Sequence, residues 1–183
     1  MTTYVALLRG INVGGNRKIL MADLRRIVCD TGCGNVSTYI QSGNLVLTSP
    51  EPEGALSALL EKAIAAATGF DVPVVLRSLS AMRSVVDANP FADRQAGGAA
   101  LHVMFFCEPP PALAFEGIDA AAHLPEELAL VGRDLYLYLP HGMGRAELPT
   151  AVSKVKGLGR PTARNWNSVT RLLARAEAIR EGR

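Results

Sequence analysis

Residues 35–48 read NVSTYIQSGNLVLT, and this stretch decides the fold of the first half of the chain. Its two ends, 35–40 and 44–48, are rich in β-branched and apolar residues, and they flank the short polar sequence QSG at 41–43. Two strand-forming runs separated by a Gly-containing turn are typical of a β-hairpin. The stretch therefore predicts two antiparallel strands that lie side by side.

The segments on either side of this hairpin predict a larger unit. An apolar strand at 4–8 and a helical stripe at 21–28 precede the hairpin, and a second stripe at 56–67 and a strand at 72–76 follow it. The order strand, helix, strand, strand, helix, strand is that of the ferredoxin-like, or split βαβ, unit. We therefore expect a four-stranded antiparallel sheet with both helices on one face.

The second half repeats most of this order. After a short helix and the turn-rich connector NPFADRQAGG, the sequence predicts three strands and two helices, at 101–106, 128–131, 135–139, 118–123 and 148–155. A last helix is expected at 163–180, with Thr162 as its N-cap. The prediction is an α+β protein of two ferredoxin-like halves with antiparallel sheets and a C-terminal helix, divided into residues 1–90 and 91–183.

Composition indicates a globular protein of the cytoplasm. Hydrophobic residues make up 49% of the 183 residues, enough for a core, and the net charge of +2 favours no class of partner. Met1 leads into TYVALLRG without the pattern of a signal peptide, and no apolar run approaches the roughly 18 to 20 residues of a membrane helix. We therefore expect a cytoplasmic location and no membrane partner.

The cysteines and histidines predict neither a disulfide framework nor a metal site. Cys29, Cys33 and Cys107 are an odd number of cysteines, and the three scattered histidines do not supply the remaining ligands of a zinc site. The spacing of Cys29 and Cys33 allows a metal pair, but reduced thiols are the simpler interpretation. We expect no metal and no cofactor.

Charge is spread unevenly along the chain. Residues 9–26 hold five basic residues against one acidic residue, and residues 144–183 hold nine against three. Residues 91–143 hold two basic and seven acidic residues. Blocks of one sign can steer a ligand of opposite charge, although a solvated helix face is the plainer interpretation.

The first basic block begins with RGINVGGNRK at 9–18, between a predicted strand and a predicted helix. At such places backbone N–H groups and a helix N-terminus often hold phosphate, and paired glycines allow a close approach of the backbone. Asn16 and Arg17 stand where a phosphate-loop NTPase has Lys and Ser or Thr, so that class is excluded. A plain Gly-rich turn is the alternative. The candidate ligand-binding residues of this loop are Arg9, Asn12, Gly14, Gly15 and Lys18.

Further candidates lie in three other polar segments. PTARNWNS at 161–168 opens the predicted last helix, where the cation of Arg164 would oppose the helix dipole unless an anion were bound. Arg164, Arg171 and Arg175 would share one face of that helix. The candidates from these segments are Arg164 and Asn165, Arg145 in PHGMGRAEL, and Gln41, Ser42 and Asn44 in the hairpin turn. Turn geometry alone also favours Ser, Gly and Asn there.

Three motifs, LRGINVGG, YIQSGN and TARNW, occur in the order found in the bacterial domain-of-unknown-function family numbered 1697, which this chain resembles over essentially its whole length. The resemblance implies a fold and a type of protein rather than an activity. The family pattern P-N-G-I-G-R-S-K-L is replaced here by PHGMGRAEL. His141 replaces Asn, and Ala146 and Glu147 replace Ser and Lys, so these last two are left out of the candidate site.

Three functions are consistent with the sequence. The first is a binding protein for a phosphate-bearing ligand, a nucleotide or nucleic acid, although the third strand lacks the aromatic residues of an RNA-recognition sheet. The second is an enzyme in which Arg9, Lys18 and Arg164 clamp a small anion and His141 or Asn44 positions a reacting group. The third is a protein-interaction role without a ligand. No catalytic motif is present, which favours the first.

Overall fold

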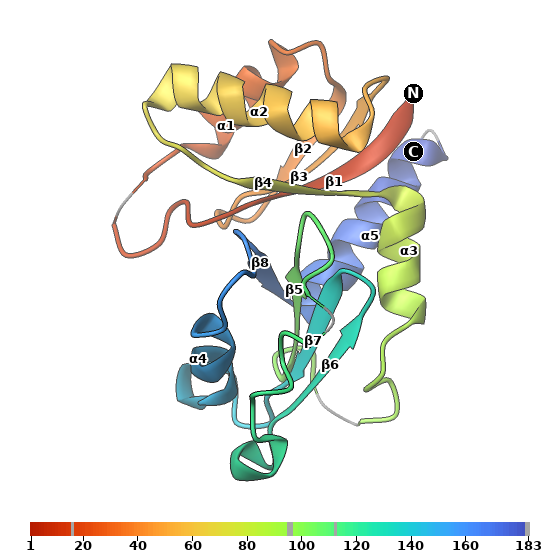
Figure 1. Cartoon of the computed structure of the whole chain (residues 1–183). Helices are drawn as coiled ribbons and strands as arrows, with labels where there is room; N and C mark the ends of the chain where they lie inside the picture. Colours follow the sequence, from red (N-terminus) through yellow and green to blue (C-terminus); the bar gives the residue numbers. More distant parts are fainter. Residues whose placement is uncertain (16, 95–96, 112, 182–183) are drawn as a thin grey trace. The chain divides into compact units, whose positions relative to one another are not determined.

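The computed structural model describes residues 1–15, 17–94, 97–111 and 113–181. The chain divides into two compact units, of which the first is Met1–Ser84 with Arg171–Arg183 and the second is Val85–Thr170. Each unit contains one four-stranded antiparallel sheet (Figure 1). The predicted α+β class with two ferredoxin-like sheets is confirmed. In the described part of the chain, no helix has the length and hydropathy needed to cross a bilayer.

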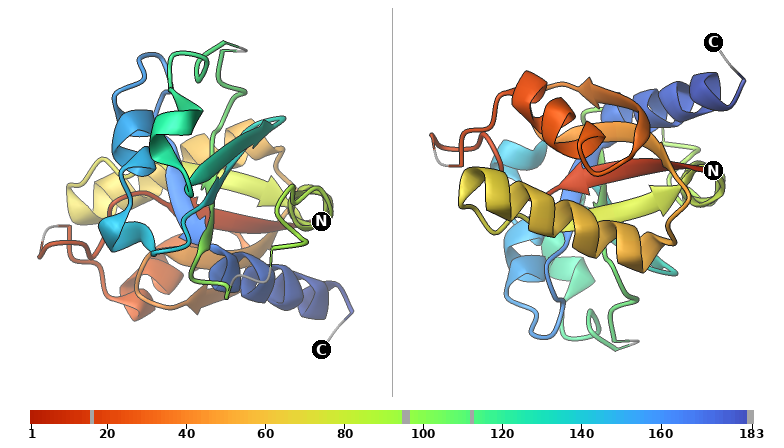
Figure 2. Two further views of the ribbon diagram at one scale, coloured as in Figure 1. Left: turned by 90° about the horizontal axis from the view of Figure 1, so that it is seen from below. Right: turned by 90° about the horizontal axis from the view of Figure 1, so that it is seen from above.

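The first unit has the strand order β2-β3-β1-β4. Helices α1 and α2 cover one face of this sheet (Figures 1 and 2). Its elements, with helix α3 that runs on into the second unit, are β1 (Thr2–Leu8), α1 (Met21–Cys29), β2 (Gly34–Tyr39), β3 (Asn44–Ser49), α2 (Glu53–Thr68), β4 (Val74–Ser78) and α3 (Leu79–Asp87).

The core of the first unit follows from the two periodicities in its sequence. Tyr4, Ala6 and Leu8 alternate along β1, so they share the sheet face that packs against Leu24 of α1 and Leu60 of α2. This contiguous apolar layer fixes the position of α1 on the sheet. The loop between β1 and α1 is therefore held at both of its ends.

The hairpin turn packs closely against the end of β1. Gly43 has φ of +79°, and its carbonyl accepts a hydrogen bond of 2.8 Å from the Leu8 amide. A Cβ atom added at Gly43 would lie 2.8 Å from both Leu8 Cβ and Ile11 Cδ1, closer than real Cβ contacts. Glycine is therefore required at this position both by the backbone conformation and by the space available.

The second unit has the strand order β6-β7-β5-β8, which is the order of the first unit. Helix α4 packs Leu148 and Val152 against Leu135 and Leu137 of β7. The elements that follow α3 are β5 (Leu101–Phe105), the 3-10 helix η1 (Ala120–His123), β6 (Glu127–Val131), β7 (Asp134–Tyr138), the 3-10 helix η2 (Met143–Arg145), α4 (Leu148–Ser153), β8 (Thr162–Asn165) and α5 (Trp166–Arg180), which continues into the first unit.

Two predicted helices of the second half were wrong in part. The helix expected at 118–123 is a single 3-10 turn, η1. The last helix does not begin at 163, because Thr162–Asn165 form strand β8, which pairs antiparallel with β5. This strand supplies the fourth strand that the split βαβ order lacked. The helix cap is then Asn165 rather than Thr162, since Asn165 Oδ1 accepts a hydrogen bond of 2.9 Å from the Ser168 amide.

His102 is a buried titratable group in the second sheet. It lies on β5 opposite Leu137 and Asn165, and only 9% of the residue is exposed. Its Nδ1 atom is shielded from solvent and has no hydrogen-bond partner among the described residues. Burial lowers the pKa of His102 below its usual value of 6.5, because the charged form loses its hydration.

We expect the substitution Gly43→Ala to lower the free energy of unfolding by about 2–4 kcal/mol, from overpacking and from the positive φ together. Chemical denaturation measures this loss. Gly69→Ala is the matched control, because Gly69 has φ of +74° with no described atom within 4 Å of an added Cβ. The control variant should lose only about 1 kcal/mol of the free energy of unfolding. Equal losses in the two variants would contradict the close packing of the turn.

We expect His102 to make the fold less stable in acid. Well above pH 6.5 the imidazole is neutral in both the folded and the unfolded state, so it adds no pH dependence there. As the pH falls below 6.5, the unfolded chain takes up a proton that the folded chain resists, so the free energy of unfolding decreases. The variant His102→Gln should lose this part of the decrease between about pH 7 and 5, whereas the exposed-site control His141→Gln should retain it. Identical profiles would refute the assignment.

Candidate functional site

The loop between β1 and α1 is a Gly-rich turn that closes on itself. Gly10, Gly14 and Gly15 have φ of +67°, +60° and +79°, which L-residues rarely adopt. The Asn12 amide donates a hydrogen bond of 3.2 Å to the Arg17 carbonyl, across the base of the loop. At Gly14 and Gly15 no described atom lies within 4 Å of an added Cβ, so their backbone faces open space.

The side chain of Asn12 joins this loop to two other segments. Its Nδ2 donates hydrogen bonds to the carbonyls of Ile19, at 3.0 Å, and Gln41, at 2.8 Å. Its Oδ1 accepts a hydrogen bond of 2.9 Å from the Ile19 amide. Asn12 itself has φ of +56°, a conformation that Asn tolerates better than most residues. Both of its side-chain N–H donors are thus used inside the protein, which makes Asn12 a positioning residue.

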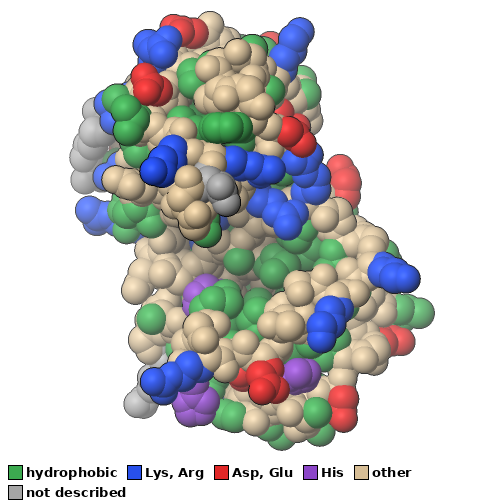
Figure 3. Space-filling model, turned by 90° about the vertical axis from the view of Figure 1, so that its left-hand side faces the viewer, with side chains coloured by type: hydrophobic (Ala, Val, Ile, Leu, Met, Phe, Trp, Pro, Cys, Tyr) green, Lys and Arg blue, Asp and Glu red, His purple; other side chains and the backbone are tan. Residues whose placement is uncertain are grey.

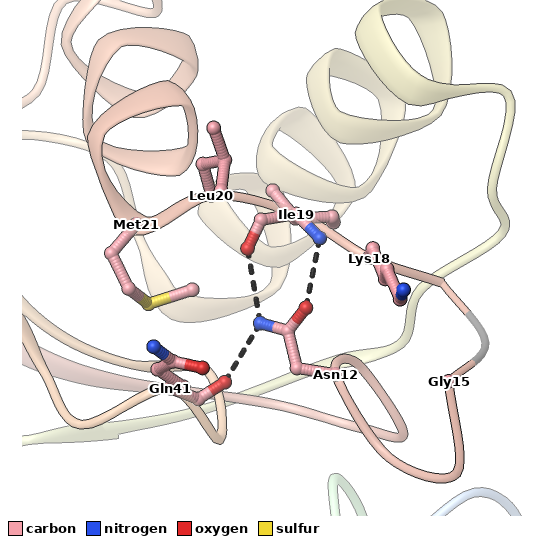
Figure 4. Close-up of a pocket in the computed structure, with 7 residues that line it drawn as sticks. All are labelled: Asn12, Gly15, Lys18, Ile19, Leu20, Met21 and Gln41. Carbon is pink, nitrogen blue, oxygen red and sulfur yellow. Dashed lines mark hydrogen bonds between the residues drawn. The ribbon is translucent and has the colours of Figure 1, made fainter.

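These hydrogen bonds hold together the walls of a pocket of about 410 Å³ (Figure 4). The pocket lies where α1 begins and where the β2–β3 turn approaches the loop. Of the seven described residues that line it, four were predicted as ligand-binding residues from two separate segments of the sequence. The lining residues are Asn12, Gly15, Lys18, Ile19, Leu20, Met21 and Gln41.

The remaining predicted residues of the hairpin turn serve the turn itself. Asn44 is fully buried, and its Nδ2 donates to the Tyr39 carbonyl at 3.1 Å and to Ser42 Oγ at 2.9 Å. The side chains of Ser42 and Asn44 therefore shape the loop rather than line the pocket. Gln41 differs, because only its backbone carbonyl is bonded to Asn12.

The surroundings of the pocket are basic. Arg9, Arg17 and Lys18 are exposed on the loop, and Figure 3 shows Lys and Arg side chains gathered over the first unit on the side where this loop lies. At the start of α1 the N-cap residue is Leu20, and no side chain among the described residues caps this end. The first N–H groups of a helix have no partner within it and carry partial positive charge. Together these groups favour an anion at the pocket, and the one carboxylate in the first turn of α1, Asp23, lies within 3.6 Å of Arg26.

The three candidates of the second unit have other environments. Arg145 is exposed in η2, and the side chain of Asn165 is engaged as the cap of α5. Arg164 lies on β8 with 8% of the residue exposed, so it does not share a helix face with Arg171 and Arg175. The proximity of these three candidates to the 9–18 loop stays a prediction.

Arg164 is held within its own strand. Its Nη1 donates hydrogen bonds of 2.7 Å to Thr162 Oγ1 and 2.8 Å to the Ala163 carbonyl. Burial lowers the pKa of Arg164 to about 10, because the guanidinium is removed from water. The cation still prevails at neutral pH, so Arg164 is a buried charge satisfied by hydrogen bonds rather than an exposed clamp.

In PHGMGRAEL, the segment that departs from the family pattern, backbone amides donate hydrogen bonds to a carboxylate of the protein itself. The carboxylate of Glu126 accepts hydrogen bonds from the amides of Glu147, at 3.1 Å, and Leu148, at 2.8 Å. These amides lie at the start of α4, so a side chain of the protein already occupies the position that an anionic ligand could take. Leaving Ala146 and Glu147 out of the candidate site agrees with this arrangement.

Sequence reasoning missed the apolar part of the pocket. Ile19, Leu20 and Met21 line it, yet in the sequence they read as the approach to a helix whose stripe enters the core. The one available signal was Leu20, because a large apolar residue is unusual at an N-cap position. In the structure 72% of the surface of Leu20 is exposed.

Comparisons with known proteins identify the family. A family model described as "Protein of unknown function (DUF1697)" matches residues 1–136, a range that contains the whole pocket. The conserved bacterial protein SP0830 from Streptococcus pneumoniae is similar in structure, with a TM-score of 0.75 and 24% identity over 96% of this chain and 98% of that chain. At this identity the likeness supports the fold alone. A search of the curated proteins finds no match.

We expect Asn12→Ala to lower the free energy of unfolding by about 2–4 kcal/mol, because it removes three hydrogen bonds and places Ala at a positive φ. Asn12→Gly keeps the backbone conformation accessible and removes only the amide, so its loss should be smaller by about 1 kcal/mol. Thermal or denaturant unfolding measures both. A loss below about 0.5 kcal/mol in each variant would show that the amide does not hold the loop.

Proposed function

Because the chain belongs to the family of proteins of unknown function DUF1697, whose membership fixes no activity, we propose from its pocket that the protein binds a small phosphate-bearing ligand at the start of α1. The observation that carries this proposal is the convergence of Asn12, Gly15, Lys18 and Gln41 on one pocket. These residues come from two segments that the sequence had singled out separately.

The chemistry of the pocket favours an anion. None of its seven described lining residues carries a carboxylate, and Lys18 contributes an ammonium group with three hydrogen-bond donors. The backbone N–H groups at Gly15 and at the start of α1 add donors and partial positive charge. Phosphate presents several acceptor oxygens and a negative charge, so it matches this set of donors.

The size of the pocket agrees with a small molecule. Its volume of about 410 Å³ falls within the roughly 300–1,000 Å³ that is usual for ligand pockets in proteins. Arg9 and Arg17, exposed on the same loop, would raise the local concentration of an anion. The proposal uses residues of the first unit alone, and the enzymatic clamp that included Arg164 is not needed for it.

We expect Lys18→Gln to weaken the binding of ribose 5-phosphate and of adenosine 5′-monophosphate by about 10- to 100-fold, the size of one lost hydrogen bond to a charged group. Isothermal titration calorimetry at low salt measures the affinities. Lys62→Gln, on the exposed side of α2, removes the same charge away from the pocket and should leave both affinities unchanged. Equal weakening in the two variants would mean that net charge, and not the position of Lys18, determines the affinity. If neither compound bound the wild type, the proposal would be wrong.

A further inference from the structure

The pocket has two chemically different ends. Figure 4 shows the Lys18 side chain on one side of Asn12, and the Met21 thioether together with the Gln41 side chain on the other. At the second end Figure 4 places Met21, which carries no charge, and Ile19 and Leu20 are the other apolar residues that line the pocket. A phosphate group alone would use the Lys18 end and leave the apolar end in contact with water.

One large hydrophobic side chain of the pocket wall lies in solvent, because Leu20 lines the pocket and is 72% exposed. A ligand with a flat apolar part would bury Leu20 and Met21, and the sulfur of Met21 would gain a favourable contact with an aromatic ring.

Gln41 supplies a polar group that is not used inside the protein. Its backbone carbonyl accepts the hydrogen bond from Asn12, but its side-chain amide makes no hydrogen bond to any described residue. An amide side chain offers one acceptor and two donors side by side. The edge of adenine, with the N6 amino group as donor and N7 as acceptor, pairs with both at once. Guanine presents two acceptors at the same edge and would leave the amide oxygen facing an acceptor.

We infer that the ligand is an adenine nucleotide, with its phosphate at Lys18 and its base between Met21 and the Gln41 amide; this inference rests on the function proposed above. The phosphate pairs with the Lys18 ammonium, and the base covers Met21 and replaces the water that hydrates the exposed Gln41 amide. The ribose spans the middle of the pocket, above the hydrogen bonds of Asn12.

The test is isothermal titration calorimetry of the full chain with adenosine 5′-monophosphate, guanosine 5′-monophosphate and ribose 5-phosphate. The wild type should bind adenosine 5′-monophosphate at least about tenfold more tightly than either other compound, the size of one bidentate base contact. Gln41→Leu should lower the affinity for adenosine 5′-monophosphate about tenfold, to that for guanosine 5′-monophosphate, so that the preference is lost. Because the Gln41 side chain is exposed and only its backbone is bonded, the variant should fold as the wild type does, which a thermal melt checks.

The outcomes separate the two proposals. Equal affinities for adenosine 5′-monophosphate and ribose 5-phosphate would overturn the adenine inference and keep phosphate binding. A parallel loss of all three affinities in Gln41→Leu would also overturn it, because the base contact would not be selective. Lys18→Gln, in contrast, should weaken all three compounds together. If no phosphate compound bound the wild type, both the inference and the proposed function would fail.

Discussion

The pocket depends on the hydrogen bonds of the Asn12 side-chain amide. This amide joins three segments, the Gly-rich loop, the chain entering α1 and the β2–β3 turn, through hydrogen bonds of 2.8 to 3.0 Å. A loop with three glycines at positive φ has much conformational entropy to lose, and these bonds offset part of that loss. Asn suits the position because it provides two donors and one acceptor and tolerates a left-handed backbone. The core beneath fixes β1 and α1, and Asn12 fixes what lies between them.

The two units share a strand order, but their described pockets have different linings. In the first unit the chain leaves β1 through a loop whose glycines keep the backbone open. In the second unit the chain leaves β5 toward three successive prolines, Pro109 to Pro111, and the described residues between there and β6 contain one 3-10 helix, η1. A pocket of about 510 Å³ lies there, lined by Asp119, His123 and Lys154 among others, and none of the predicted residues contributes to it. The two units therefore have the same strand order but different surfaces. This is expected, because core packing determines a fold whereas the loops determine the sites on it.

Most of the fold could be predicted from the sequence because its signals were local. The two strand-forming runs and the turn in residues 35–48, and the apolar stripe of α2, each specify their elements without help from the rest of the chain. Strand β8 was missed because four residues, TARN, give too short a pattern to separate from the helix that follows. It is a strand because β5 offers a free edge, which is a tertiary cause. The burial of Arg164 follows from the same strand pairing, and no sequence pattern predicts it.

The pocket was predictable in its polar half only. Gly-rich and turn residues indicated where a ligand could approach, and Asn12, Gly15, Lys18 and Gln41 do line one cavity. The apolar half depends on how α1 packs on the sheet, because this packing decides which residues before the helix face the pocket. The sequence does not specify that packing for each residue. Asn12 and Asn44 also show that a polar residue in a loop can be used entirely for structure, and only its hydrogen-bond partners distinguish that use from binding.

A titration of the 15N-labelled protein with adenosine 5′-monophosphate, followed by backbone and side-chain amide resonances, tests the central claim most directly. The account predicts shifts confined to residues 12–21 and to Gln41, including the side-chain amide of Gln41, while the amides of the second unit remain unchanged. Shifts centred on the second unit, around Lys154 or Arg145, would contradict it.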